Sequence, residues 1–134
     1  MKPNYLISFE TIDTQSLIDL CKSGFSTQTF DEVASHLQVP DLRLADIIHI
    51  PKSTLIRRKR EGRFSFEESE RLYRIVRLYN MAMKVFGTHE NAREWLRTPS
   101  GDFGGKSPLE FADTEIGARE VEAVLDRISD GVIF

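Results

Sequence analysis

The 134-residue sequence predicts an all-α protein built in two parts. Apolar residues recur every three or four positions over long stretches, as they do in helices that bury one face. Side chains that can cap a helix precede these stretches, and Gly or Pro residues follow them. We find no internal repeat and no alternating apolar pattern of strand length, apart from a weak one over residues 5–9.

The first half of the chain contains four expected helices, which span about residues 14–23, 30–39, 41–48 and 51–61. Asp13 or Thr14 opens the first of them, and Gly24 suits the left-handed position that follows a helix. Thr29 and Glu32 form a capping box, in which each side chain can accept a hydrogen bond from a free backbone N–H. The second helix is therefore expected to begin just after Thr29.

The second half is expected to contain a long helix over residues 66–86 and three shorter helices, which begin after Thr88, Ser107 and Thr114. Ser65 and Glu68 form a capping box at the start of the long helix, and Ser107 and Glu110 form another. The apolar surface of the long helix is wide, so we expect it to be buried on two sides, in a bundle or at a dimer interface. The candidate dimer contacts are Leu72, Ile75, Leu78, Tyr79, Met81 and Met83.

The composition excludes several classes of function. No stretch approaches the roughly 18 apolar residues of a membrane span, and the first residues lack a secretory signal, so we expect a cytoplasmic protein without a membrane partner. The single Cys21 cannot form an internal disulfide, and the three His residues lack metal-ligand spacing, so no metal or cofactor is expected. We find no pair of nucleophile and base, and therefore do not expect an enzyme.

The net charge of −3 conceals an uneven distribution. Residues 52–63 carry six basic residues against one acidic residue, a net charge of +5. Residues 1–51 carry three basic and seven acidic residues, and residues 64–134 carry nine and thirteen, so each of these segments has a net charge of −4. A basic run of this kind is often only a solvated face, so its structural context decides what it does.

Residues 41–58 fit a helix-turn-helix. The expected packing residues of the motif are Leu44, Ala45, Ile48, Ile50 and Leu55. His49 occupies the turn position that needs a positive φ, where glycine is usual. Arg58 occupies a late position that is normally apolar.

The second helix of such a motif enters the major groove of DNA, where arginine pairs well with guanine. The candidate DNA contacts are Lys52, Ser53, Thr54, Arg57, Arg58, Arg60 and Arg63. The alternative is a helical hairpin with a purely structural role. At the other end of the chain, the apolar residues Val132, Ile133 and Phe134 can either dock on the chain's own core or insert into a partner.

The run IPKSTLIRRKREGRF over residues 50–64 resembles the signature of Xre-type antitoxins of the MbcA/ParS/Xre family, with Phe64 where leucine is usual. Further blocks match this family in order and spacing: Phe86-Gly87, Ala92–Leu96, Thr98-Pro99, Gly104–Glu110, Glu115–Glu122 and Leu125–Val132. The resemblance covers about residues 25–134.

This resemblance implies an Xre/Cro-like helix-turn-helix domain over residues 1–64 and a helical domain for toxin binding and dimerisation over residues 65–134. It implies an antitoxin that forms homodimers, binds operator DNA to repress its own operon, and blocks a RES-domain toxin that degrades NAD⁺. The implied toxin contacts are Arg119, Arg127, Gly131, Val132, Ile133 and Phe134. The alternative function is a stand-alone dimeric transcriptional regulator, which a neighbouring gene for a RES-domain protein would argue against.

Overall fold

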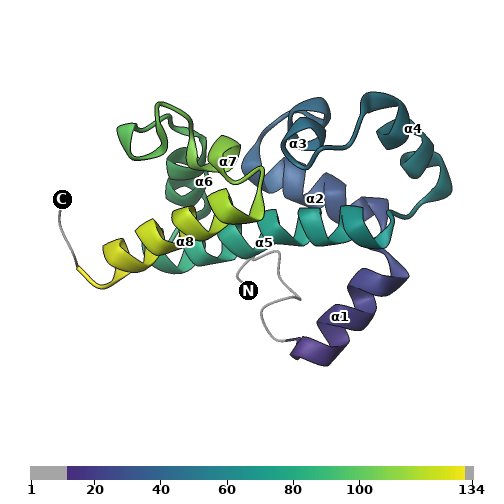
Figure 1. The fold of residues 1–134 in the computed structure, drawn as a ribbon, viewed down its shortest axis with the longest axis horizontal. Coiled ribbons are helices and arrows are strands. Elements are labelled where there is room, and N and C mark those ends of the chain that lie inside the picture. The colour runs from purple at the N-terminus through teal and green to yellow at the C-terminus, as the bar shows by residue number, and fades with distance from the viewer. Residues whose placement is uncertain (1–11, 132–134) are drawn as a thin grey trace. The chain divides into compact units, whose positions relative to one another are not determined.

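A computed structural model describes residues 12–131 (Figure 1). The named secondary-structure elements of these residues are all helical, which confirms the all-α prediction, and no helix among them is long and apolar enough to cross a membrane. The chain divides into two compact units between Tyr73 and Arg74, inside a long helix, whereas the sequence suggested a boundary after residue 64. The weak extended pattern over residues 5–9 and the tail residues 132–134 lie outside the described residues.

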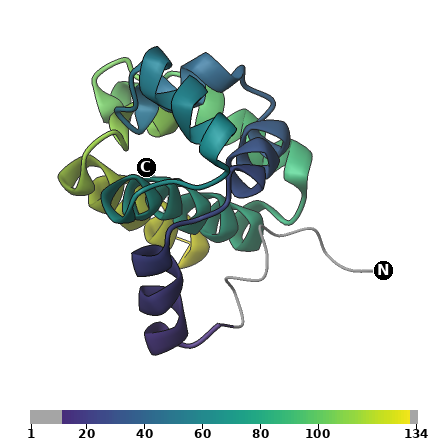
Figure 2. The ribbon, with the colours of Figure 1, turned by 90° about the vertical axis from the view of Figure 1, so that its right-hand side faces the viewer.

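The first unit contains α1 (Thr14–Ser23), α2 (Thr27–Leu37), α3 (Asp41–Ile47), α4 (Lys52–Glu61) and the first turns of α5 (Phe66–Phe86). Within this unit α2, α3 and α4 lie together, while α1 stands apart from them in both views (Figures 1 and 2). The Asp13 carboxylate accepts a hydrogen bond from the Ser16 N–H at 2.7 Å, so α1 is capped as expected. All five expected packing residues of the helix-turn-helix are buried.

The start of α2 differs from the expectation. Ser26, not Thr29, is the N-cap, and Thr29 lies inside the helix. The cause is a backbone clip with the end of α4: the Thr27 N–H donates to the Gly62 carbonyl at 3.1 Å, and the Phe64 N–H donates to the Phe25 carbonyl at 2.9 Å. This pairing fixes the chain in an extended conformation up to Ser26, so the helix begins three residues earlier than the capping box suggests.

The start of α4 is also shifted by one position. Pro51 is its N-cap, with an extended ψ of 150°, and Lys52 is the first helical residue. The expectation had placed Pro51 inside the first turn, but both positions suit a residue without a backbone N–H to donate. Gly62 follows α4 in the left-handed conformation, as expected.

The second unit contains the remainder of α5, α6 (His89–Arg97), the 3₁₀ turn η2 (Gly101–Phe103), α7 (Pro108–Phe111) and α8 (Glu115–Ser129). The three predicted caps are confirmed: the hydroxyls of Thr88, Ser107 and Thr114 accept hydrogen bonds from the N–H groups of Asn91, Glu110 and Gly117. The Trp95 ring packs against Phe86 and Phe103, and Phe103 contacts Phe111, so aromatic rings link α5, α6, η2 and α7. Trp95 is thus half-buried and packs against the core of this unit.

The wide apolar surface of α5 is buried within the chain. Among the six candidate dimer contacts, five are buried in this structure and Met81 is half-buried. The five buried residues are Leu72, Ile75, Leu78, Tyr79 and Met83. In this conformation they offer almost no surface to a second copy of the chain, so their role in dimerisation stays a prediction.

Candidate nucleic-acid interface and partner surface

The turn between α3 and α4 has the geometry of a helix-turn-helix. His49 adopts a φ of 57°, so the position expected to need a positive φ has one, and histidine is among the residues that tolerate it. The Ile50 N–H donates to the Ala45 carbonyl at 2.8 Å, which closes the turn. The buried Ala45 is small enough to let α4 lie close to α3.

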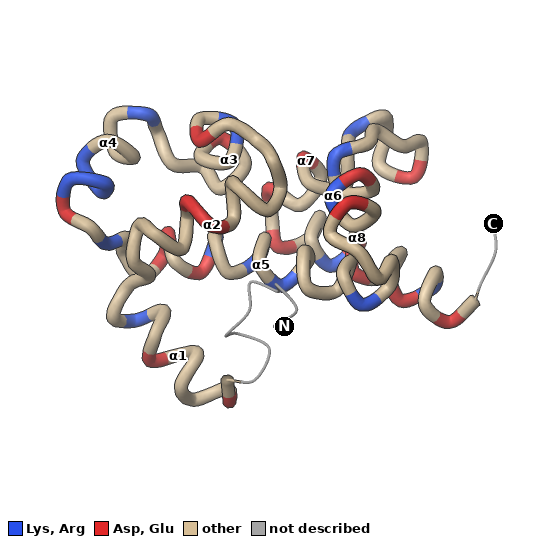
Figure 3. The backbone as a smooth tube through the Cα atoms, turned by 180° about the vertical axis from the view of Figure 1, so that it is seen from behind, with Lys and Arg blue, Asp and Glu red and all other residues tan. Residues whose placement is uncertain are grey.

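The six basic residues of segment 52–63 fall into two groups. Arg58, Lys59 and Arg63 contact groups of the protein itself. Lys52, Arg57 and Arg60 are exposed, and they form no hydrogen bond or ion pair within residues 12–131. Figure 3 shows the Lys and Arg positions gathered on α4. The outward-facing positive charge of this helix therefore comes mainly from three residues.

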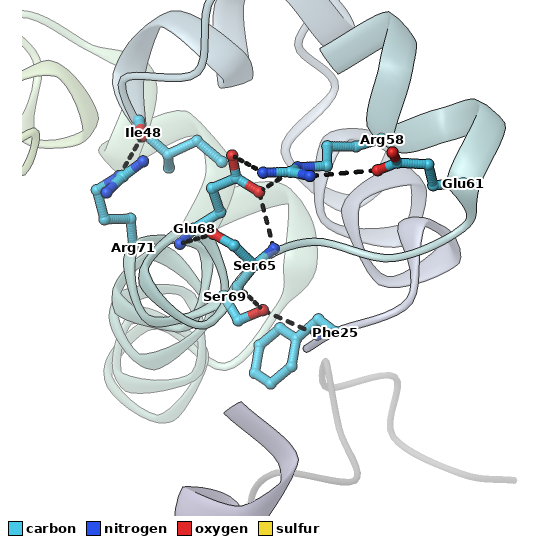
Figure 4. Close-up of polar contacts among 8 residues, drawn as sticks. All are labelled: Phe25, Ile48, Arg58, Glu61, Ser65, Glu68, Ser69 and Arg71. Carbon is cyan, nitrogen blue, oxygen red and sulfur yellow. Dashed lines mark hydrogen bonds and ion pairs between the residues drawn. The ribbon is translucent and has the colours of Figure 1, made fainter. Parts of the chain in front are cut away.

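Arg58 fastens α4 to the first turn of α5. Its Nε and Nη2 atoms donate to the two carboxylate oxygens of Glu68 at 2.7 and 3.2 Å, and Nη1 donates to Glu61 at 3.2 Å (Figure 4). Glu68 also accepts from the Ser65 N–H at 2.8 Å, which completes the predicted capping box. A normally apolar position thus holds an arginine because a buried carboxylate faces it. Our proposal for the DNA contacts therefore leaves Arg58 out.

The Arg58–Glu68 contact shifts the pKa values of both groups. Burial alone raises the pKa of Glu68, but hydrogen bonds from Arg58 and Ser65 outweigh burial, so the pKa lies below its ordinary value of 4.5. The hydrogen bond to Glu68 raises the pKa of Arg58. Glu68 is therefore ionised at any pH near neutrality.

Acid is expected to weaken this unit through Glu68. Because the pKa of Glu68 is lower in the folded chain than in the unfolded one, its contribution is complete above pH 4.5 and is lost as the pH falls through the folded value. Urea unfolding at several pH values between 6 and 3 measures this loss. The stability difference between the wild type and Glu68→Gln should be largest at pH 6 and shrink below pH 4.5. A constant difference would contradict the assignment.

Arg63 and Lys59 hold other parts of the same unit. Arg63 Nη1 donates to the Gly24 carbonyl at 2.6 Å, which ties the end of α1 to the backbone clip. Lys59 forms ion pairs with Asp31 and Asp41, and its Nζ lies 5.4 Å from the centre of the Phe30 ring. These two cations therefore have a structural role, which accounts for part of the basic run. Arg63, like Arg58, is not included among the proposed DNA contacts.

The candidate toxin contacts lie on and after α8. Arg119 is exposed, and its Nε donates to Glu115 at 3.3 Å, while Arg127 is half-buried. Gly131 is exposed, with a φ of 77°, and its N–H donates to the Ile128 carbonyl at 3.1 Å. Val132, Ile133 and Phe134 lie outside the described residues.

Ile116 is an exposed apolar residue that the sequence pattern did not single out. Its side chain is 84% exposed, and it lies off the buried stripe of α8. It borders a shallow cavity of about 350 Å³, lined by Lys106, Phe111, Asp113, Thr114, Ile116, Gly117 and Glu120. The sequence could have predicted this exposure from the helical periodicity. Ile116 is two residues before the buried Ala118, so it falls on the opposite side of the helix.

Comparison with known proteins assigns each half of the chain. Residues 16–77 match the family model of the antitoxin Xre-like helix-turn-helix domain, and residues 81–131 match that of the antitoxin Xre/MbcA/ParS C-terminal toxin-binding domain. A curated protein named Antitoxin Xre from Yersinia enterocolitica is 36% identical over 118 residues, which cover 87% of this chain and 80% of the relative.

Two further proteins named Antitoxin Xre match shorter stretches. One from Pseudomonas putida is 36% identical over 83 residues, which cover 61% of this chain and 52% of the relative. One from Photorhabdus laumondii is 34% identical over 74 residues, which cover 54% and 50%. With both domain models matched in order and a relative aligned over most of its length, the chain belongs to the Xre/MbcA/ParS family of antitoxins.

Proposed function

We propose that the chain is the antitoxin of a type II toxin–antitoxin system, which binds and inhibits a cognate NAD⁺-degrading RES-domain toxin in the cytoplasm. It also binds operator DNA through α4 and represses its own operon. The observation that carries this proposal is the match of its two halves, in order, to a helix-turn-helix domain and a toxin-binding domain. Inhibition is stoichiometric, since the chain acts by contact and not by catalysis.

The proposed DNA surface is the outer face of α4. It comprises the exposed or half-buried residues Lys52, Ser53, Thr54, Arg57 and Arg60. The first residues of α4 would approach base edges, and the later arginines would contact phosphates or guanine. Specific recognition requires two such helices on paired half-sites, so the DNA-binding form is a homodimer or a complex that contains one.

Removing the two outward-facing arginines of α4 is expected to weaken DNA binding. The double variant Arg57→Ala/Arg60→Ala should bind a fluorescent duplex from the promoter of its own gene at least about tenfold more weakly. Its thermal melting should be unchanged, because both side chains are exposed and form no hydrogen bond or ion pair with the described part of the protein. The matched control is Arg97→Ala/Lys106→Ala, which removes the same charge from exposed positions of the second unit. Equal affinity for all three proteins would contradict the proposal.

The proposed toxin surface combines Arg119, Arg127 and the residues from Gly131 to Phe134. We add Ile116 to this surface, because an exposed apolar side chain in a toxin-binding domain is a candidate contact with the toxin. Aliphatic side chains that lose their contact with water on binding contribute most where they fill a pocket of the partner.

Truncation after Ser129 is expected to impair neutralisation. This change removes the exposed Gly131 and the three apolar tail residues, while every buried residue of α8 remains. Cells that co-express the truncated chain with its proposed RES-domain toxin should grow poorly, and toxin binding should weaken at least about tenfold. A circular dichroism melt serves as the control for folding. Undiminished protection would remove the tail from the toxin surface.

A further inference from the structure

An aliphatic residue lies at the centre of the cationic face of α4. Ile56 is 50% exposed, although it lies in the middle of a helix with a buried side available. The buried side is occupied by Leu55, the anchor of the helix-turn-helix. Residues four apart on a helix are neighbours, so Ile56 has Lys52 one turn before it and Arg60 one turn after it.

The surroundings of Ile56 determine which partner fits it. Single exposed apolar residues are common, and a site for another protein would need a contiguous apolar patch. Around Ile56 the exposed neighbours on α4 are Lys52, Ser53, Arg57, Lys59 and Arg60, all polar or charged. Lys59 is paired with Asp31 and Asp41, but Lys52, Arg57 and Arg60 have no anionic partner within residues 12–131. The face therefore suits a polyanion better than an apolar protein surface.

The major groove of DNA offers such a face one apolar group, the C5-methyl of thymine. An isoleucine has no hydrogen-bonding atom, so it cannot pair with a base edge or a phosphate. It can cover a methyl group while the flanking cations hold the phosphates on either side. Among the described residues of this unit, the other apolar residue that is about equally exposed is Leu42, at 51%, which lies on α3 and outside the recognition helix.

We propose that Ile56 contacts the methyl group of one thymine in the bound site and so makes the chain selective for thymine at that position. This inference rests on the proposed binding of DNA through α4. Ile56 then selects the base, while Lys52, Arg57 and Arg60 provide most of the sequence-independent attraction to the DNA phosphates.

The test uses the full chain and synthetic duplexes. Duplexes with a randomised centre of about two helical turns are selected for binding to the wild type, and the tightest one becomes the probe. Each thymine of the probe is then replaced singly by deoxyuridine, which removes only the methyl group. We expect the wild type to lose about fourfold in affinity at one thymine position of a half-site, the effect of burying about one methyl group.

The variant Ile56→Ala completes a double-mutant cycle. It should bind the parent duplex about fourfold more weakly, and it should bind the parent and the deoxyuridine duplex equally well. The matched control Leu42→Ala should keep the sensitivity of the wild type to deoxyuridine. If all three proteins show the same sensitivity at every thymine, the inference about Ile56 is overturned and DNA binding stands. If the wild type enriches no duplex, the proposed DNA binding is contradicted, and with it the inference about Ile56.

Discussion

Glu68→Ala is expected to lower the unfolding free energy by about 3 kcal/mol, the typical cost of leaving one partner of a buried ion pair alone. The Glu68 side chain is only 9% exposed and accepts three hydrogen bonds, two from Arg58 and one from the Ser65 N–H. Its loss leaves the guanidinium facing an empty site and removes half of the capping box. Urea unfolding followed by circular dichroism measures the change.

The same arginine provides the control. Glu61 also contacts Arg58, at 3.2 Å, but its side chain is 49% exposed. An ion pair in that setting contributes little, so Glu61→Ala should change stability by about 0.5 kcal/mol or less. If the two alanine variants are equally stable, Glu68 has no special structural role.

Gly117→Ala is expected to destabilise the second unit by about 3 kcal/mol. A Cβ atom at this position would lie 1.8 Å from the carbonyl oxygen of Phe111, which belongs to the backbone and cannot rotate away. The Gly117 N–H also donates to the Thr114 hydroxyl, so a shift of the first turn of α8 would disturb its cap. Alanine is a better helix former than glycine by about 1 kcal/mol, but the clash outweighs this gain.

Gly101→Ala is the matched substitution in the same unit. Nothing lies within 4 Å of a Cβ atom built at Gly101. We expect a result between no change and a gain of about 1 kcal/mol in unfolding free energy, because alanine restricts the unfolded chain. Thermal melts of the two variants show whether the loss of stability is specific to the close packing at Gly117, or whether any Gly→Ala substitution destabilises this unit. Equal melting temperatures would show that α8 and α7 can separate without cost.

The sequence was informative where structure depends on neighbours along the chain. The caps at Asp13, Ser65, Thr88, Ser107 and Thr114 all appear in the structure, because each depends on a side chain and an N–H no more than three residues away. The positive φ at His49 follows from its place in the turn, and it too was expected. Local chemistry was sufficient for these features.

Contacts between distant segments were not predictable in the same way. A capping box at Thr29 was reasonable, but the pairing of residues 25–27 with residues 62–64 moved the helix start. The basic run gives a second example. Arg57 and Arg60 point to solvent, whereas Arg58, Lys59 and Arg63 contact groups of the protein that lie far away along the chain. Those partners are Glu68, Asp31, Asp41 and the Gly24 carbonyl. The width of the apolar face of α5 likewise did not reveal whether the chain itself or a second copy covers it.

The Phe25 N–H donates a hydrogen bond to the Ser69 hydroxyl at 2.8 Å, so the supports of the first unit extend into α5. A gene segment that ends at residue 64 encodes every side chain of the proposed DNA surface of α4, but neither this hydroxyl nor the Glu68 carboxylate. A recombination event at that point would combine α4 of one antitoxin with the residues of another antitoxin at the positions of Glu68 and Ser69. A chimera that keeps the proposed DNA surface on its own supports must therefore join the two chains after Ser69, within α5.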